Sequence, residues 1–420
     1  MPIINPDDDG FLNLSDHDSF AGGIPHNTFS RMRDEDPLPW TDFAGGRGFW
    51  SIVRHADILK MNRNFRLLSS AQGIRMEDQS HEEYLARRTF QETDPPDHTK
   101  TRIKVSKAFS KPVIAQFEDQ IRSLCDEILD ASFSSSEFDA VTHIARQLPM
   151  RMLGQILAVP DKDLEWLVKK GDELIANSDP DYTDHVIDQV DTDEFRLMPF
   201  RSPAGAELYS YARELMDDRR AAGEDAGIMG MLLEPDEDGN TISEDEFRNF
   251  FCLLVAAGND TTRYSIAASL HALANDACLV AQLQQADEKT WEMMPDEMIR
   301  WASPTFHFRR TALDDFEMHG KQVKKGDKVI LWFVSANRDA DEFERPFEID
   351  IHRSPNRHVS FGQGGPHVCL GMWLARLEVR VLMQEFVKRV KSVEQAGEIA
   401  CLRSNFVGGI KKLPLRIQLA

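Results

Sequence analysis

The stretch VSFGQGGPHVCLGMWLAR, residues 359–376, sets a single cysteine, Cys369, at the end of a glycine-rich run and directly before a helical pattern. A thiol at the start of a helix lies near the positive end of the helix dipole and close to free backbone N–H groups, and both favour the thiolate. The glycines remove side-chain bulk on both sides, so a flat, bulky partner can approach the backbone closely. Taken alone, such a cysteine is more often a small buried apolar residue than a ligand. The glycines are Gly362, Gly364, Gly365 and Gly371.

The composition of the whole chain limits the class of protein. With 420 residues the chain is long enough to bury a large core and to enclose a sizeable ligand. Five cysteines without a Cys-X-X-Cys pair or close, even spacing predict neither a disulfide framework nor a zinc site. Lysine and arginine number 49 against 70 aspartates and glutamates, a formal net charge of -21, which argues against nucleic acid as a partner.

The beginning of the chain lacks the pattern of a targeting signal. Residues 1–16 contain neither a basic segment nor an apolar segment of the secretory type. The longest apolar run, FFCLLVAAG at 250–258, is far shorter than the roughly 18 residues that a membrane span requires. We therefore expect a cytoplasmic protein without a membrane anchor.

The pattern along the chain predicts one domain over residues 1–420, mainly α with small β-sheets (α+β). No internal repeat, low-complexity tract or Pro/Gly/Ser linker separates two cores. Helical signals dominate, and shorter alternating stretches are typical of strands. Helices are expected within 94–110, 243–276 and 371–390, and strands near 47–53, 316–333 and 405–419.

The cysteine stretch resembles the haem-binding loop of the cytochrome P450 superfamily of haem-thiolate monooxygenases, and the resemblance extends over nearly the whole chain. The family pattern is an aromatic residue, glycines, a basic residue and the cysteine followed by glycine, here Phe361, Gly362, His367, Cys369 and Gly371. The resemblance implies the P450 fold, with haem b between the long central helix and the cysteine-loop helix. It also implies that Cys369 is the axial ligand of the haem iron. The aromatic residue and the cysteine are eight positions apart rather than the common seven, so one residue is inserted in GQGGP.

The long helical pattern carries a second motif, AAGNDTTR at 256–263, which is similar to the oxygen-activation motif of the family. By this similarity Ala257 and Gly258 leave space beside the iron, and Asp260 and Thr261 are the catalytic acid and alcohol. Cleavage of O2 requires two protons in a mostly dry pocket, which suits a hydroxyl that holds water and a carboxyl group that relays from solvent. Without the cysteine loop, two threonines in a helix would only be a mildly unfavourable choice.

Haem carries two propionates, and burying these anions requires cations or hydrogen-bond donors. The family pattern places such groups at positions matched here by His98, Arg102, Arg310 and His358. His98 and Arg102 are four residues apart and share a helix face, as one shared anion requires. Each of the four, taken singly, also fits a surface cation.

Glu297 and Arg300 form an i, i+3 pair that would ordinarily be a helix-surface contact. The resemblance instead implies a buried triad with Arg353 that supports the underside of the haem loop. We assign this triad a structural role.

The resemblance also implies which segments form the substrate pocket. They are residues 72–92, the middle of the long helix, and the stretches 305–308 and 405–407. The aromatic residues among them favour an apolar cavity that binds mainly by desolvation, although such aromatics also suit an ordinary core. The pocket candidates are Ala256, Phe306, Phe308, Phe406 and Val407.

Two features of the pocket rim stay open at the level of sequence. Residues 176–205 are acidic, rich in turn residues and poorly periodic, which fits either a lid or a plain solvated loop. Arg75, Arg87 or Arg88 could meet a substrate carboxylate, but the sequence does not indicate which way they point.

Two segments of this acidic protein are locally basic. The resemblance places both on the cysteine side of the haem, where electrons enter, and a basic face there would attract an acidic ferredoxin. A solvated helix face is the alternative. The residues are Lys100, Lys104, Lys107, Lys111, Arg376 and Arg380.

Together these observations predict a monomeric, bacterial-type monooxygenase that uses O2 to oxidise a hydrophobic small molecule. Electrons would come from a separate ferredoxin and its NAD(P)H-dependent reductase, because no reductase domain follows the cysteine helix. Bacterial members that oxidise terpenoids, sterol side chains and branched alkyl compounds are the most similar in their motifs, with small aromatics as an alternative. Three rival interpretations are a peroxygenase that uses hydrogen peroxide, a haem-thiolate sensor or ligand carrier without turnover, and a helical protein with an inert cysteine.

Overall fold

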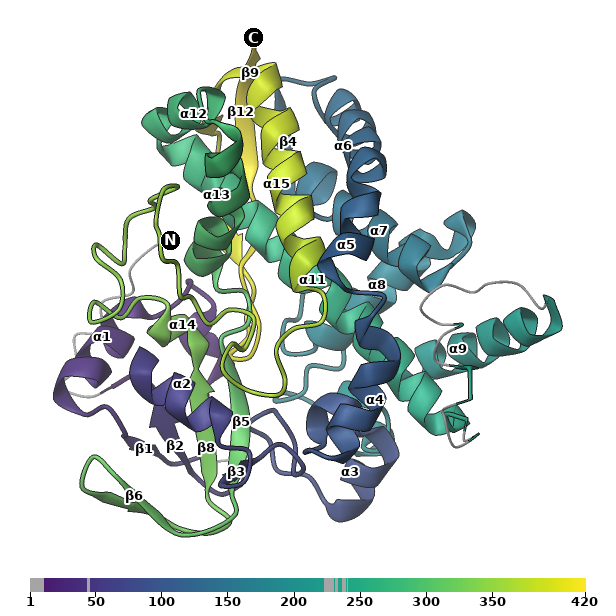
Figure 1. The fold of residues 1–420 in the computed structure, drawn as a ribbon, viewed down its shortest axis with the longest axis vertical. Helices are drawn as coiled ribbons and strands as arrows, with labels where there is room; N and C mark the ends of the chain where they lie inside the picture. The colour runs from purple at the N-terminus through teal and green to yellow at the C-terminus, as the bar shows by residue number, and fades with distance from the viewer. Residues whose placement is uncertain (1–10, 44–45, 223–229, 231–232, 236–238, 240) are drawn as a thin grey trace.

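The computed structural model describes residues 11–43, 46–222 and 241–420, and in addition 230, 233–235 and 239. The first ten residues of the N-terminal stretch, where the sequence predicts no targeting signal, lie outside the described residues. Helices dominate the molecule and small sheets lie at its edges, which confirms the predicted fold class (Figure 1).

The described chain forms α-helices, short β-strands and short 3-10 or π turns. The α-helices are α1 (His26–Glu35), α2 (His55–Arg63), α3 (His81–Arg87), α4 (Asp97–Ser106), α5 (Lys111–Ile114), α6 (Glu118–Ser132), α7 (Gln147–Leu157), α8 (Leu164–Ile175), α9 (Pro203–Ala222), α11 (Glu244–Asn275), α12 (Ala277–Gln284), α13 (Glu288–Ala302), α14 (Phe333–Ala336) and α15 (Met372–Arg389). The strands are β1 (Trp40–Thr41), β2 (Phe49–Ile52), β3 (Leu68–Ser69), β4 (Glu137–Asp139), β5 (His307–Ala312), β6 (Phe316–Met318), β7 (Lys321–Val323), β8 (Lys328–Trp332), β9 (Val390–Gln395), β10 (Ala400–Cys401), β11 (Ile410–Lys412) and β12 (Pro414–Leu419). Short 3-10 or π turns are η1 (His17–Phe20), η2 (Phe90–Glu92), η3 (Ala115–Phe117), η4 (Val141–Ala145), η5 (Asp161–Asp163), η6 (Asp193–Phe195) and η7 (Pro199–Arg201).

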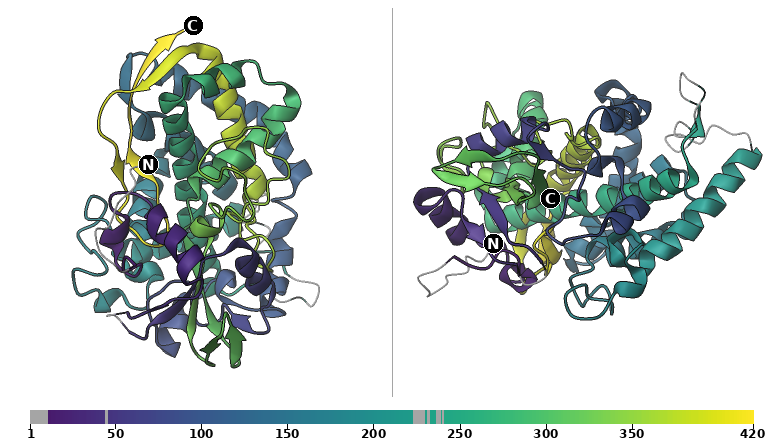
Figure 2. Two further views of the ribbon diagram at one scale, coloured as in Figure 1. Left: turned by 90° about the vertical axis from the view of Figure 1, so that its left-hand side faces the viewer. Right: turned by 90° about the horizontal axis from the view of Figure 1, so that it is seen from below.

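The largest sheet has five strands in the order β1-β2-β8-β5-β3. β2 and β8 run parallel, with Phe49 opposite Lys328, whereas β8 and β5 are antiparallel, with His307 opposite Trp332. A three-stranded sheet in the order β4-β12-β9 lies at the opposite end of the molecule (Figure 2). The helices between these two sheets therefore form the main body.

Helix α11 is the longest helix that the structure describes and crosses the middle of the molecule (Figure 1). It begins with a capping box, in which the Ser243 hydroxyl accepts the Glu246 N–H and the Glu246 carboxylate accepts the Ser243 N–H. Its residues are buried on nearly all sides, as is typical of a central helix. No single described helix is long and apolar enough to cross a membrane, whereas α11 and α12, joined at a bend of 107°, qualify as a pair by length and composition.

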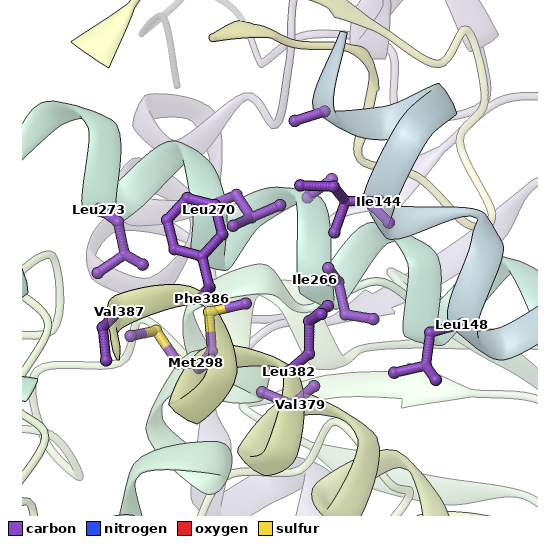
Figure 3. Close-up of a cluster of buried hydrophobic side chains, with 14 of the residues drawn as sticks. Ile144, Leu148, Ile266, Leu270, Leu273, Met298, Val379, Leu382, Phe386 and Val387 are labelled. Atoms are coloured by element: carbon purple, nitrogen blue, oxygen red, sulfur yellow. The ribbon is translucent and has the colours of Figure 1, made fainter. Parts of the chain in front are cut away.

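Apolar side chains fix α15 against α11. Figure 3 shows Ile266 and Leu270 of α11 facing Leu382 and Phe386 of α15, and all four are fully buried. Removing such a side chain from water stabilises the fold by about 1.5 to 3 kcal/mol. Because α15 begins directly after the cysteine stretch, this packing also fixes the position of Cys369 relative to α11.

The predicted helices correspond to α4, α11 and α15, and each is confirmed to within a few residues. The predicted strands correspond to β2, to β6 through β8, and to β11 and β12. The pairing of these strands brings distant parts of the chain together and is not readable from the local pattern.

Candidate functional site

The loop before α15 holds the cysteine in a defined position. The Cys369 N–H donates to the Phe361 carbonyl at 2.8 Å, which closes the loop. Gly362 and Gly364 adopt φ values of +70° and +94°, so the two turns of the loop require glycine. Gly371 caps α15 and lies beside the Cys369 sulfur.

Asn62 of α2 clamps the same loop from outside. Its side-chain amide donates to the carbonyls of Gly362 and Gln363 at 2.9 and 3.1 Å. A Cβ at Gly365 would collide with the backbone oxygen of Asn62, so a glycine is required there for close approach of the loop to α2.

The Cys369 side chain faces an internal space. It is open to a molecule the size of water, although protein atoms surround it. In the mostly buried middle of α11, Gly258 is exposed and Ala257 and Thr261 are partly exposed. Gly258 has a second constraint, because a Cβ there would lie 3.0 Å from Leu153. The space between these groups is the place where the sequence predicts a flat, bulky haem.

Burial raises the pKa of the Cys369 thiol, whereas the Gly371 N–H, Arg102 and Arg376 lower it. A bound metal ion deprotonates a coordinating thiol outright, so the sulfur fits an axial ligand once iron is present. Of these three groups, the Gly371 N–H is the one that the position before a helix was predicted to supply; Arg102 and Arg376 were predicted for other roles.

Four basic side chains meet beside the cysteine loop: His98, Arg102, Arg310 and His367. The ring centroids of His98 and His367 lie 4.1 Å apart. Burial lowers the pKa of His98 to about 4 and that of His367 to about 2. Burial also lowers the pKa of Arg310 to about 10, with Asp94 as the acid that opposes this shift. Within the described part of the chain, both ring nitrogens of His98 and Nδ1 of His367 are buried without a hydrogen-bond partner. Such a group of unpaired donors fits the propionates of haem.

His358 does not join this cluster, which corrects its predicted assignment. Its Nε2 lies 2.9 Å from Asp296, and Arg376 donates to the same carboxylate oxygen at 2.7 Å. His367 takes the place that was expected for His358. The signal was available in the sequence, because His367 is the basic residue of the cysteine-loop pattern, two positions before Cys369.

The expected triad on the underside of the loop is present. Arg300 makes two hydrogen bonds of 2.7 Å to the carboxylate of Glu297, and Arg353 donates to the same carboxylate at 3.1 Å. Arg300 also donates to the carbonyls of Asn337 and Glu348, both at 2.9 Å. The triad thus joins α13 to the segment before the cysteine loop, in keeping with a structural role.

The acid and the alcohol of α11 have different partners. The Thr261 hydroxyl donates to the Ala257 carbonyl at 3.0 Å. Asp260 is buried and pairs with Arg263 at 2.9 Å, and Arg263 also binds Asp172 at 2.6 Å. Burial raises the pKa of Asp260 despite Arg263, and the neighbouring Asp172 raises it further.

This charge network extends to the surface. Arg146, whose side chain is 26% exposed, lies 2.9 Å from Asp172. A chain of ionic contacts therefore leads from the surface through Asp172 and Arg263 to Asp260. The second oxygen of Asp260, Oδ2, has no hydrogen-bond partner among the described residues.

A cavity of about 140 Å³ lies beside Thr261. Four of the five pocket candidates line it, namely Ala256, Phe308, Phe406 and Val407. Its other lining residues are Gly73, Ile74, Arg75, Glu77, Gln79, Arg87, Thr89, Gln91, Glu92, Ile175, Ile187, Pro199, Phe200, Arg201, Asn249, Cys252, Leu253, Ala257, Thr261 and Thr305.

Phe306 does not line the cavity, contrary to the prediction. Thr305 and Phe308 line the cavity, whereas the Phe306 ring stacks on the Phe20 ring with 5.3 Å between the centroids. Regular alternation would place Phe306 on the same side as Phe308, but β5 begins only at His307, so the alternation does not extend back to Phe306. Of the three candidate arginines, Arg75 and Arg87 line the cavity. Arg88 is exposed and lies over the Tyr84 ring instead.

The segment 176–205 contributes to the cavity wall, whereas the sequence did not distinguish a lid from a solvated loop. Ile187, Pro199, Phe200 and Arg201 line the cavity from this side. Sequence reasoning missed these four because the segment has no periodicity that would indicate an inward face.

Comparison with known proteins gives consistent results. A protein-family model described as Cytochrome P450 matches residues 68–411. A steroid C26-monooxygenase from Mycolicibacterium smegmatis is 32% identical over 423 residues, covering 98% of this chain and 94% of the relative. A methyl-branched lipid omega-hydroxylase from Mycobacterium bovis is 32% identical over 410 residues, covering 93% and 91%. The solved structure of a Mycobacterium marinum cytochrome P450 in complex with pseudoionone superposes with a TM-score of 0.87 at 31% identity, covering 98% of this chain and 99% of the other.

Proposed function

Because the chain belongs to the cytochrome P450 family and is a haem-b-dependent monooxygenase, we propose that it hydroxylates a terpenoid, a sterol side chain or another branched alkyl compound. The observation that carries this proposal is the cavity, which adjoins Ala257 and Thr261 in the middle of α11, where the motif predicts the space beside the iron. The named relatives act on steroid C26 and on methyl-branched lipids, both hydrophobic aliphatic targets. An apolar α11 wall suits such substrates.

The residues around the internal space fit haem. Cys369 would be the axial ligand of its iron, and His98, Arg102, Arg310 and His367 would hold its propionates. When bound, haem supplies the iron chemistry that activates O2. The chain contributes the thiolate, the cations and a site from which bulk water is excluded.

We assign proton delivery to Asp260 and Thr261. The raised pKa of Asp260 means that its carboxyl group retains a proton to higher pH than an ordinary aspartate, and its free Oδ2 can pass a proton on. Arg263 and Asp172 hold this carboxyl group in place, and Arg146 extends their ionic contacts to the surface. In an assay with ferredoxin and its reductase, the Asp260→Asn variant should form at least about tenfold less product per NADH consumed than the wild type. The matched control Thr262→Ala should form as much product per NADH as the wild type. Unchanged coupling in Asp260→Asn would exclude this role.

We further propose that a separate ferredoxin in the cytosol supplies the electrons and that it docks on α4 and α5. Lys100, Lys107 and Lys111 are exposed there, and Ile103 between them is 66% exposed. An apolar centre within a basic rim suits an acidic protein partner.

Turnover separates the proposal from its rivals. The purified protein would be incubated under ¹⁸O₂ with a ferredoxin, its reductase and a panel of terpenoids and sterols, and the products analysed by mass spectrometry. We expect alcohols that carry one labelled oxygen atom. Faster turnover with hydrogen peroxide than with ferredoxin would favour a peroxygenase. Binding without any product would favour a sensor or carrier.

A further inference from the structure

The guanidinium group of Arg75 is the least satisfied cation among the described lining residues of the cavity. It lies between the rings of Phe200 and Phe406, 5.3 and 5.1 Å from their centroids. One weak hydrogen bond, from Nη2 to Asn177 Oδ1 at 3.4 Å, is described for it. Nε and Nη1 are buried and have no acceptor among the residues that the structure describes. Buried donors without partners are costly, so this position calls for an additional acceptor.

The other two arginines of the cavity wall already have partners. Arg87 donates to Gln79 Oε1 at 3.2 and 2.8 Å and to the Arg196 carbonyl at 3.1 Å. Arg201 donates to Glu83 at 3.2 Å. Hence Arg75 is the lining arginine whose donors a ligand could satisfy.

Nε and Nη1 of Arg75 lack an acceptor among the described residues, but a nearby carboxylate, Glu77, already balances the charge of the guanidinium group. Glu77 Oε2 lies 3.4 Å from Arg75 Nε, outside hydrogen-bond geometry. Burial raises the pKa of Glu77, but Arg75 and His17 outweigh burial and bring the pKa below its ordinary value, so Glu77 is ionised at neutral pH. A ligand carboxylate at Arg75 would therefore lie beside a second anion, and the two would repel each other. An uncharged oxygen can accept from Arg75 without this repulsion.

The opposite wall has a different character. From α11 it consists mainly of Cys252, Leu253, Ala256 and Ala257. Its two polar side chains are already engaged, because the Asn249 amide and the Thr261 hydroxyl both donate to backbone carbonyls. A ligand in this cavity thus meets an apolar wall on the side of the predicted oxidation and a donor group on the wall that Arg75 provides.

We infer that Arg75 anchors the substrate through an uncharged oxygen function, a carbonyl or a hydroxyl, on an otherwise apolar branched skeleton. This inference rests on the proposed function and specifies its substrate class. A site built to donate hydrogen bonds discriminates strongly against an analogue that lacks the acceptor, because its buried donors then remain unpaired. Arg75 is accordingly a specificity-determining residue, and a carboxylate, which Arg75 could bind by sequence alone, is disfavoured by Glu77.

Four ligands with one geranyl skeleton test this inference. They are geranylacetone, the corresponding secondary alcohol, the hydrocarbon without the oxygen, and geranylacetic acid, which replaces the terminal methyl ketone by a carboxylate. Dissociation constants would be measured by calorimetry on the haem-loaded protein at neutral pH. We expect the ketone and the alcohol to bind at least about tenfold more tightly than the hydrocarbon, as one hydrogen bond to a charged donor implies, and the acid to bind more weakly than the ketone.

Arg75→Met keeps an unbranched side chain between the two aromatic rings but removes the donors. We expect it to reduce the preference for the ketone over the hydrocarbon to within about twofold, since only packing remains. Arg88→Met, at the exposed arginine outside the cavity, is the matched control and should keep the wild-type preference. The wild-type measurements stand on their own if the variant fails to fold.

Three results would overturn the inference: equal binding of ketone and hydrocarbon by the wild type, tightest binding of the acid, or an unchanged preference in Arg75→Met. Absence of binding by all four ligands would also overturn it. If the ligands bind in the expected order but yield no product with ferredoxin, the inference stands and the proposed function is wrong.

Discussion

His358 and His367 lie nine positions apart in one loop but have different surroundings. Asp296 lies within hydrogen-bond distance of His358, whereas Nδ1 of His367 is buried and has no partner among the residues that the structure describes. The Ser70 hydroxyl lies 3.2 Å from Nε2 of His367, which leaves Nδ1 free to donate to another group. These partners, rather than the residue type, assign His358 to the scaffold and His367 to the anion site.

His367→Ala should therefore weaken haem retention. Loss of one hydrogen bond to a charged group corresponds to about 1.5 to 3 kcal/mol, so haem should transfer to apomyoglobin roughly tenfold faster or more. Absorbance spectroscopy follows this transfer. His81→Ala, at an exposed histidine of α3, is the control and should release haem at the wild-type rate. An unchanged rate in His367→Ala would exclude the residue from the propionate site.

The protonation of Glu378 makes the stability of the fold depend on pH. Glu378 in α15 is 2% exposed, and its Oε2 has no hydrogen-bond partner in the part of the chain that the structure describes. Burial raises its pKa from 4.5 to about 8. Between these two pH values the unfolded chain releases a proton that the folded chain keeps, so stability falls as pH rises through this window and levels off above about 8.

Glu378→Gln should remove this dependence. As the pH rises from 4.5 to about 8, the free energy of unfolding of the variant should increase relative to that of the wild type by at most about 1.4 kcal/mol per pH unit. Urea unfolding of the haem-loaded protein at three pH values measures the difference, with the exposed Glu398→Gln as control. A difference that is the same at every pH would show that Glu378 does not titrate there.

At the level of elements, α4 and α5 carry the basic face that the sequence predicts, but α15 does not add to it. Arg376 is bound to Asp296 at 2.7 Å and Arg380 to Glu118 at 2.6 Å. The docking surface is thereby reduced to the lysines around Ile103. Sequence alone could not make this distinction, because both acids come from other helices.

The double variant Lys100→Glu/Lys107→Glu should slow reduction by an acidic ferredoxin. Reversing two charges in a negatively charged protein should lower the association rate about tenfold at low salt, and the effect should shrink as the ionic strength rises. Stopped-flow absorbance measures the rate. The variant Lys391→Glu/Lys412→Glu, at exposed lysines of β9 and β11, changes the net charge equally and is the control. Equal rates for the double variant and this control would place the partner elsewhere.

The middle of α11 shows what an element adds to its motif. The motif predicts Ala257 and Gly258 as space beside a cofactor, and in a mostly buried helix Gly258 is exposed and Ala257 is partly exposed. The partners of Asp260 were not predictable, since Asp172 comes from α8, about ninety positions earlier, and its contact depends on how the two helices pack.

For the whole molecule, sequence patterns were sufficient for the fold class, the three main helices and the cysteine loop. These features depend on local periodicity, glycine positions and one motif. The cavity required the structure, because its walls come from residues 73–92, the segment 176–205, α11 and the stretch 405–407. Phe306 shows the limit most directly, because it lies just before β5 and does not follow the alternation that would place it on the same side as Phe308.

The parallel pairing of β2 with β8 joins residues about 280 positions apart and orders the sheet on one side of the molecule (Figure 2). Such pairing depends on the global arrangement of the chain and not on the strands themselves. The net charge of -21, by contrast, is a property of the sequence alone, and the basic face on α4 and α5 differs from it in sign.

The central claim is that Cys369 ligates haem iron as a thiolate, and the absorption spectrum of the reduced protein under carbon monoxide tests it most directly. We predict the red-shifted Soret band of thiolate-ligated haem in the wild type and its loss in Cys369→Ser, with Cys278→Ser, at an exposed cysteine, retaining it. If Cys369→Ser kept that band, or if the wild type bound haem without it, the account of the site would be contradicted.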